Sequence, residues 1–142
     1  MQNLSKWLAK YKEYGPTILR LILGIVFIAH GWQKLQNIGA VAGFLGQVGI
    51  PAAGFFAYIL TIVEFFGGIL VLLGLFTRIS ALLISIVMIV ALLTVKAQVS
   101  LLSGATGAGK ELDLALLAIA LALSLLGSGA LSLEKTIFKK EW

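Results

Sequence analysis

The sequence contains no cysteine and only one histidine, His30. Without cysteine, the chain has no disulfide, no thiol nucleophile and no thiolate ligand for zinc or for an iron–sulfur cluster. A single histidine cannot supply both axial ligands of a bis-histidine haem. We therefore expect no haem, no iron–sulfur cluster and no metal site in this chain. Any thiol chemistry would require a partner protein.

Charged residues are also scarce. They make up 12% of the 142 residues, whereas about 25% is usual in soluble domains. Apolar residues make up 60% and the mean hydropathy is +1.05, which is more apolar surface than a soluble domain of this size can cover. We therefore expect one multi-pass domain over residues 1–142, located in the cell membrane with the lipid bilayer as its partner.

The net charge of +5 does not indicate nucleic acid as a partner. The lysines form no patch with interleaved aromatic residues, which is the usual footprint of a nucleic-acid-binding surface. Their position in short connections between apolar stretches is instead typical of a membrane protein.

Four apolar stretches have the length that a membrane-spanning helix needs. They cover about residues 16–35, 52–76, 79–95 and 110–126. At a rise of about 1.5 Å per residue, each crosses or nearly crosses the hydrocarbon core. The sequence therefore predicts an all-α protein, an integral membrane four-helix bundle.

The segments outside these spans have their own character. Residues 1–15 carry an apolar helical face beside several lysines, which indicates an amphipathic helix on the cytoplasmic leaflet; a frayed tail with a few anchoring side chains is the alternative. That face consists of Leu4, Trp7, Leu8 and Tyr11. The apolar connection between the first two spans is expected to fold back against the outer interface. Residues 127–142 are predicted to form a cytoplasmic tail.

The positions of the basic residues give the orientation. Eight lysines and arginines lie on one side of the four spans and three on the other. Because cytoplasmic loops are enriched in such residues, we expect both termini in the cytoplasm. The larger group is Lys6, Lys10, Lys12, Arg20, Arg78, Lys135, Lys139 and Lys140, and the smaller is Lys34, Lys96 and Lys110.

Residues 104–110 read GATGAGK and match the G-x-x-x-x-G-K part of a P-loop. A P-loop needs Ser or Thr after the lysine to hold Mg²⁺, whereas Glu111 follows here. The predicted orientation also places this loop outside, away from cytoplasmic ATP and ahead of a membrane helix. We therefore expect no nucleotide.

Each predicted span has one face of polar or small residues. At about 100° per residue, the faces are as follows: Arg20, Gly24, Phe27, His30, Gly31 and Lys34; Thr61, Glu64, Gly67, Gly68 and Val71; Ser85, Met88, Leu92 and Lys96; and Glu111, Ala115, Ala118 and Ala122. Small residues allow membrane helices to approach closely, so we expect all four faces to point inward.

Inward-facing charges would then meet in the outer half of the bundle. We expect Glu64 beside His30 and Lys34, and Glu111 beside Lys96, whereas Asp113 points toward the outer interface and Arg20 extends to the cytoplasmic headgroups. Ionisable residues within a membrane indicate a functional site by default. The candidate ligand-binding residues are therefore His30, Lys34, Glu64, Lys96 and Glu111. Ion pairs that only fix the packing of the helices are the alternative.

Three stretches of the sequence resemble the DoxX family of small four-helix membrane proteins. They read LRLILGIVFIAHGWQKL, VEFFGGILVLLGLFTRISALLI and GKELDLALLAIALALSLLGSGALSLE, and span about residues 17–134. The family's basic residue at the end of the first span matches Lys34, and its acidic residues in the second and fourth spans match Glu64 and Glu111. Its closing G-x-G-x-x-S-L-acid pattern ends here in Glu134, where many relatives carry aspartate.

The resemblance implies a membrane subunit tied to redox chemistry, because family members are linked to thiosulfate:quinone oxidoreduction and to oxidative-stress complexes. Our first hypothesis is an accessory, quinone-associated subunit that works with a redox partner protein. His30 or Lys34 would bond a quinone oxygen and Glu64 would relay protons. The ring would stack on one of three aromatic residues, Phe27, Trp32 or Phe65.

Two other hypotheses stay open. The chain is a non-catalytic membrane scaffold or chaperone if its buried charges serve only the fold. A small-solute carrier ranks third, because four short helices without a detectable inverted repeat make a poor transporter. A homo-oligomer is compatible with all three.

Overall fold

The computed structural model describes residues 2–102, 104 and 109–139. Residues 105–108, which belong to the P-loop-like stretch, and Lys140, which was counted for the orientation, lie outside these described residues. The described chain is helical and contains no strand element. Its helices are α1 (Gln2–Ala9), η1 (Lys12–Tyr14), α2 (Gly15–Leu35), α3 (Ile38–Gln47), α4 (Ala53–Leu73), α5 (Thr77–Leu93), α6 (Glu111–Leu126) and α7 (Leu133–Phe138).

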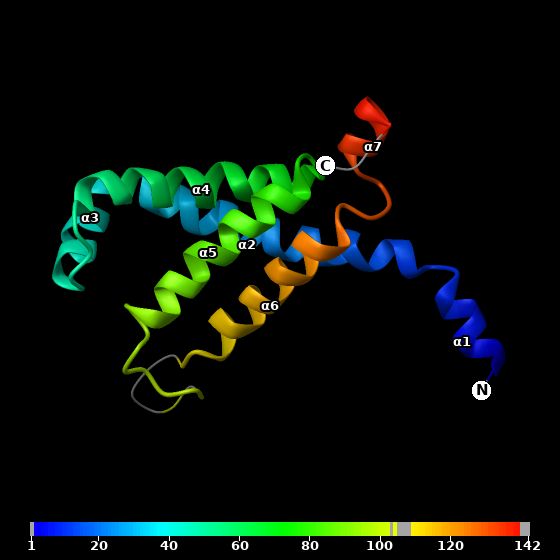
Figure 1. Ribbon diagram of the computed structural model, residues 1–142, viewed down its shortest axis with the longest axis horizontal. Helices are drawn as coiled ribbons and strands as arrows, with labels where there is room; N and C mark the ends of the chain where they lie inside the picture. The colour runs from blue at the N-terminus through cyan, green and yellow to red at the C-terminus, as the bar shows by residue number, and fades with distance from the viewer. Residues whose placement is uncertain (1, 103, 105–108, 140–142) are drawn as a thin grey trace.

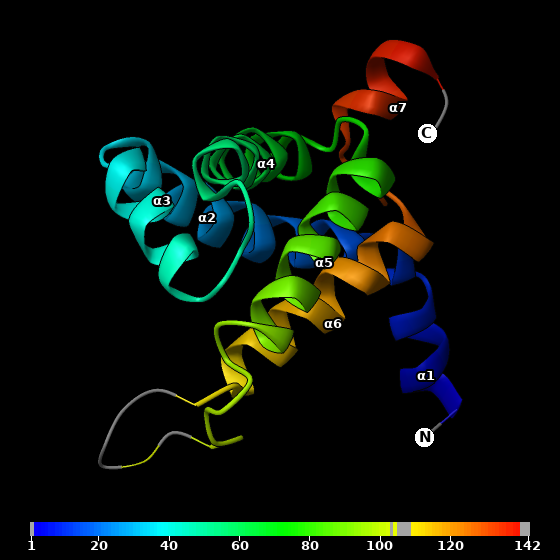
Figure 2. The same ribbon diagram turned by 60° about the vertical axis from the view of Figure 1, so that its left-hand side comes forward.

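The four longest helices form two antiparallel pairs. α2 packs along α4, and α5 packs along α6, while α4 also contacts α5 and α2 also contacts α6. The two pairs meet near α7 and diverge toward α3 and the connection between α5 and α6 (Figure 1). Figure 2 shows the same divergence from a second direction. Their boundaries lie within a few residues of the four stretches expected from the sequence.

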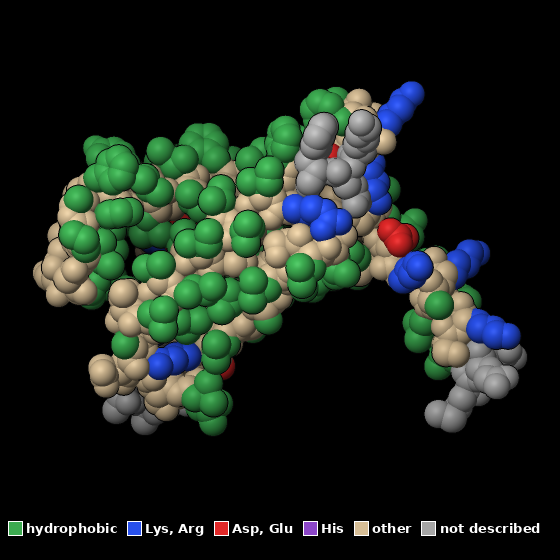
Figure 3. Space-filling view, in the orientation of Figure 1, with side chains coloured by type: hydrophobic (Ala, Val, Ile, Leu, Met, Phe, Trp, Pro, Cys, Tyr) green, Lys and Arg blue, Asp and Glu red, His purple; other side chains and the backbone are tan. Residues whose placement is uncertain are grey.

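Two of the helical segments are long and apolar enough to cross a membrane. They are Lys12–Leu35 and Ala53–Leu73, and Thr77–Leu93 is a shorter apolar helix. The outward face of α2 carries exposed isoleucines at 18, 22 and 25. Figure 3 shows apolar side chains spread over much of the visible surface, as expected where a protein meets lipid instead of water.

The inward face predicted for α4 is confirmed, and those of α2 and α5 are confirmed in part, since His30 is exposed and Leu92 is only half-buried. Glu64, Gly67 and Gly68 are buried in α4, and Ser85 and Met88 are buried in α5. The core, shared by the four long helices, consists of Leu23, Phe27, Val71, Ala81, Ile84, Met88, Leu116, Ala120 and Leu123.

Glycine sets the distance between α2 and α4. A Cβ atom at Gly31 would lie 2.4 Å from the backbone nitrogen of Phe65, and one at Gly68 would lie 2.8 Å from the backbone nitrogen of Ile28. These backbones can therefore approach closely only because both positions lack a side chain. Gly67 differs from its neighbour, since a Cβ atom there would make an ordinary 3.6 Å contact with Ile84.

The inward face predicted for α6 was wrong. Its buried residues are Leu116, Ala120 and Leu123, while Ala115 and Ala118 are exposed. The small-residue rule favoured the alanines, but the face that packs into the core carries Leu116, Ala120 and Leu123. The helix is therefore rotated so that Asp113, and not Glu111, shares the buried face.

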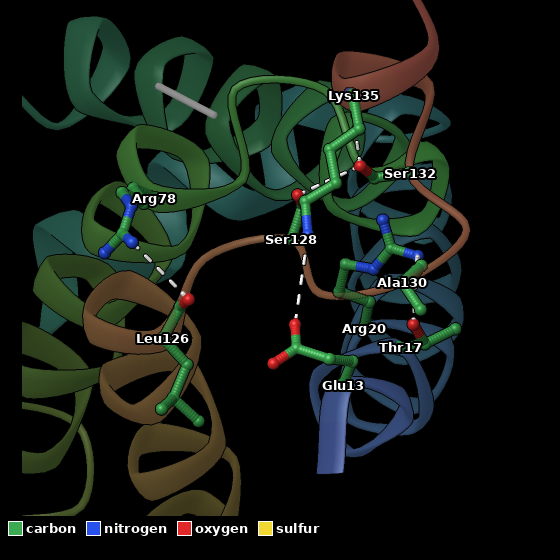
Figure 4. Close-up of polar contacts among 9 residues, drawn as sticks. All are labelled: Glu13, Thr17, Arg20, Arg78, Leu126, Ser128, Ala130, Ser132 and Lys135. Carbon is green, nitrogen blue, oxygen red and sulfur yellow. Dashed lines mark hydrogen bonds and ion pairs between the residues drawn. The ribbon is translucent and has the colours of Figure 1, made fainter. Parts of the chain in front are cut away.

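The expectation that Arg20 extends to the cytoplasmic headgroups was also wrong, because its side chain is buried in the protein. Only 2% of it is exposed, and its guanidinium donates to the backbone carbonyl of Leu131 at 3.1 Å. Thr17 donates to the carbonyl of Ala130, as Figure 4 shows. Gly74 makes room for the arginine, because a Cβ atom there would lie 1.6 Å from its NH1 atom.

The segment after α6 is consequently part of the packed structure. Ser128, Ser132 and Glu134 are buried, the two serine hydroxyls are 3.0 Å apart, and the backbone nitrogen of Glu134 donates to the carbonyl of Gly74 at 3.0 Å. Arg78 donates to carbonyls in the last turn of α6, where a cation is favoured by the helix dipole.

Candidate functional site

The end of α2 and the middle of α4 are joined by an ion pair. The ammonium of Lys34 donates to the carboxylate of Glu64. Glu64 lies on the same buried face of α4 as Gly67 and Gly68, which brings it against α2, and Lys34 is in the last turn of that helix. The Glu64 side chain is 6% exposed and that of Lys34 is 27% exposed. The acid is therefore the buried member of the pair, and the predicted contact is confirmed.

A cavity of about 680 Å³ lies beside this pair. It occupies the space where the α2–α4 pair diverges from the α5–α6 pair, and α3 contributes a further wall. Figure 3 shows the corresponding hollow between the α3 end of the molecule and α5. Its walls are mainly apolar, and its polar lining includes Lys34 and Glu64. This combination of apolar walls with a few polar groups is typical of small-molecule sites.

A second ion pair lines the cavity from the other helix pair. Lys96, just after α5, lies 3.5 Å from a carboxylate oxygen of Asp113 in α6, and their side chains are 26% and 24% exposed. The expected pairing of Lys96 with Glu111 was therefore wrong. The rotation of α6 explains this, because Glu111 and Asp113 are two residues apart and so point to different faces of the helix.

The other predicted site residues are distributed unequally. His30 lines the cavity together with Lys34, Glu64 and Lys96, whereas Glu111 does not. The Glu111 carboxylate lies instead close over Gly109, since a Cβ atom at that glycine would be 2.1 Å from its Oε2 atom.

Aromatic residues around the site also separate into two groups. Phe27 lines the cavity and also belongs to the core, where it is 2% exposed. Trp32 and Phe65 do not line it, and their rings pack against each other with centroids 6.0 Å apart. Neither ring is therefore in position to stack on a ligand bound in this cavity.

Sequence reasoning did not select two parts of the site. One is Asp113, which was assigned to the outer interface. The other is α3, which places Phe44 in the cavity wall. The apolar connection was expected to fold against the bundle, but its sequence carries no signal for which side chains face inward.

The lining as a whole is close to electrically neutral. It includes two lysines, two carboxylates and one histidine. A charged ligand would meet a like charge at either ion pair, whereas a neutral molecule with hydrogen-bond acceptors could bond to the lysines. Among the described residues, no group of three or more histidine, cysteine or acidic side chains could hold a metal ion.

Comparison with known proteins gives the family. The family model described as DoxX matches residues 15–97. A protein of Bacillus subtilis (strain 168) named "Putative oxidoreductase CatD" is 38% identical over 89% of this chain and 90% of its own length. The membrane protein Rv3486 of Mycobacterium tuberculosis (strain H37Rv) is 34% identical over 92% of this chain and 86% of its own.

A further relative covers less of the chain. The inner membrane protein YqjF of Escherichia coli (strain K12) is 32% identical over 51% of this chain and 55% of its own. No solved structure matches. The family match covers more than half of the residues, includes both members of the buried ion pair and agrees with the resemblance inferred from the sequence. The chain is therefore a membrane protein of the DoxX family.

Proposed function

We propose that this protein is a quinone-associated accessory subunit of a membrane redox or oxidative-stress complex. The observation that carries the proposal is the cavity, in which apolar walls meet the Lys34–Glu64 pair. A quinone has the matching chemistry, because it is a neutral, flat ring with carbonyl oxygens that accept hydrogen bonds. The relative named as an oxidoreductase supports a redox role.

The polar residues that line the cavity would have different roles in quinone reduction. Reduction of a quinone to a quinol takes up two electrons and two protons, and the electrons would come from a redox group on a partner protein. Lys34 would donate a hydrogen bond to a carbonyl oxygen and stabilise the negative charge that develops there during reduction. Glu64, in contact with Lys34, would deliver protons to that oxygen. His30 is a second donor in the same cavity.

The proposed placement in the membrane uses four crossing helices, α2, α4, α5 and α6, with both termini in the cytoplasm. Arg20, Arg78 and Lys135 lie at one end of the molecule in the cluster of Figure 4. Lys34 and Lys96 lie at the cavity end. Because basic residues favour the cytoplasmic side, the cavity would open in the outer half of the membrane.

Quinone binding tests the proposed function. We expect purified protein in lipid nanodiscs to bind decylubiquinone saturably. The double variant Lys34→Met with Glu64→Gln, which leaves no charge unpaired, should bind about tenfold or more weakly, since hydrogen bonds to charged groups are worth about 1.5–3 kcal/mol. Lys110→Met is the matched control, because Lys110 bonds to the carbonyl of Ala97 and does not line the cavity. Equal binding by the two variants, or no saturable binding by the wild type, contradicts the proposal.

A cysteine-free chain makes the orientation easy to test. Ile137→Cys in α7 and Leu102→Cys before α6 each place one thiol at an exposed position. A membrane-impermeant maleimide added to intact cells should label Leu102→Cys, and should label Ile137→Cys only after the cells are permeabilised. The opposite pattern would invert the proposed topology and leave the cavity in the cytoplasmic half.

A scaffold role is the second candidate, and a specific observation favours it. Each ion pair links two helices, Lys34–Glu64 joining α2 to α4 and Lys96–Asp113 joining the end of α5 to α6, as expected if the pairs serve only the fold. In that case quinone should neither bind saturably nor raise the melting temperature, although loss of either member of the Lys34–Glu64 pair would still lower it.

A further inference from the structure

The cavity has an opening between α3 and α5. Phe44 of α3 and Val90 of α5 both line it, yet they are also 46% and 45% exposed at the molecular surface. The two side chains therefore reach from the inside of the cavity to its outer rim. Figure 3 shows the hollow on this side of the molecule.

The packing of α3 leaves this opening in place. α3 lies mainly against α4, with a minor contact to α2, and Leu45 is its only buried residue. On the other side, α5 turns away from α4 toward α6 (Figure 2). Both rim residues are apolar, and in the proposed membrane placement the opening would face acyl chains, where water-soluble molecules do not concentrate.

The side chains of the two ion pairs are 6–27% exposed, less than the two apolar rim residues at 46% and 45%. Lys34 and Glu64 come from α2 and α4, and Lys96 and Asp113 come from the far helix pair. A ligand arriving from the bilayer would therefore pass apolar side chains first and reach the ion pairs last. The volume of about 680 Å³ is that of a site for a drug-sized molecule, so the long isoprenoid tail of a membrane quinone would not fit inside together with its ring.

We propose that a neutral amphiphile enters this cavity sideways from the bilayer, polar head first, and leaves its apolar tail in the opening between Phe44 and Val90. The inference rests on the proposed function for the identity of the head group, a quinone ring. It adds the route of entry, the orientation of the ligand and the residues that contact its tail.

The proposed route is tested by measuring how the binding affinity depends on the tail of the quinone. Two probes share one ring: 2,3-dimethoxy-5-methyl-benzoquinone, and the same ring with a decyl chain. Val90→Trp narrows the opening, and Ile86→Trp is the matched control, one turn earlier on α5 and 50% exposed but not part of the cavity lining. Binding to nanodisc-embedded protein would be measured by quinone absorbance, and folding would be checked by gel filtration and thermal melting.

We expect Val90→Trp to weaken binding of the decyl quinone by about tenfold or more while changing that of the tailless ring by less than about threefold. Ile86→Trp should change neither. Each quinone partitions into the lipid equally for all variants, so the ratio of variant to wild-type affinity isolates the contact with the tail.

The other outcomes separate the two proposals. If Val90→Trp leaves both affinities unchanged while the wild type binds, or weakens both equally, the tail does not occupy this opening and only the inferred route is overturned. If the wild type binds neither probe, the proposed quinone function fails and the route fails with it. Val90→Cys, the only thiol in that variant, gives an independent readout: the decyl quinone should protect it from a lipid-soluble maleimide and the tailless ring should not.

Discussion

Lys34→Met is expected to lower the free energy of unfolding by about 3–5 kcal/mol, the usual cost of removing one member of a buried ion pair. The loss arises because Glu64, whose side chain is 6% exposed, would keep its charge away from water with no cation beside it. Glu64→Ala should cost less, since the Lys34 side chain is 27% exposed and can extend into the cavity. Thermal unfolding in mild detergent would measure both.

The second ion pair is a matched control for this effect. Lys96 is 26% exposed, almost the same as Lys34, but its partner Asp113 is 24% exposed. Lys96→Met should therefore lower the free energy of unfolding by about 1 kcal/mol or less, as is usual for pairs that reach solvent.

A double variant Lys34→Met with Glu64→Gln should recover much of the stability lost in Lys34→Met. If the double variant is no more stable than the single one, the unpaired Glu64 carboxylate is not the cause of the lost stability.

Gly31→Ala is expected to be nearly as damaging, although it adds only one methyl group. The new Cβ atom would lie 2.4 Å from the backbone nitrogen of Phe65 and 2.6 Å from its Cα atom. Neither atom belongs to a flexible side-chain end, so α2 and α4 would have to move apart. Overpacking of this kind costs about 1–3 kcal/mol and occasionally more. We also expect a distorted Lys34–Glu64 pair, because its members lie on these two helices.

Gly67→Ala is the control for the glycine prediction. Its Cβ atom would make an ordinary 3.6 Å contact with Ile84, and alanine is favoured over glycine in a helix by about 1 kcal/mol. The melting temperature should therefore stay the same or rise in Gly67→Ala and fall in Gly31→Ala. The melting temperature should also fall in Gly68→Ala, whose Cβ atom would lie 2.8 Å from the backbone nitrogen of Ile28. Equal melting temperatures in all three variants would mean that the helices are not in close contact.

The two predictions address the same question about function. The cavity exists where the helix pairs diverge, and the close contact between α2 and α4 holds one of its walls and its buried acid in place. A variant such as Gly31→Ala should therefore weaken quinone binding without altering any residue that lines the cavity. Lys34→Met should affect both stability and binding, so only the double variant with Glu64→Gln separates these roles.

Much of the local structure follows from the sequence alone. The apolar stretches, with proline, glycine and lysine between them, predict the boundaries of α2, α4, α5 and α6 to within a few residues. The polar face of α4, and part of those of α2 and α5, were also predictable, because each contrasts with an apolar face on the same helix. The contact between Lys34 and Glu64 followed from those faces and from the depth of the two residues along their helices.

The rest was decided by how the helices pack. α6 is apolar on nearly every side, and the small-residue rule wrongly favoured the alanine face under Glu111 over the leucine face under Asp113. Only the packing of α6 against the other helices selects the second and brings Asp113 to Lys96. Arg20 is buried because residues far along the chain return to offer their carbonyls. The cavity likewise has no signature in the sequence, since it depends on the angle between two helix pairs, and that angle results from contacts among all four helices.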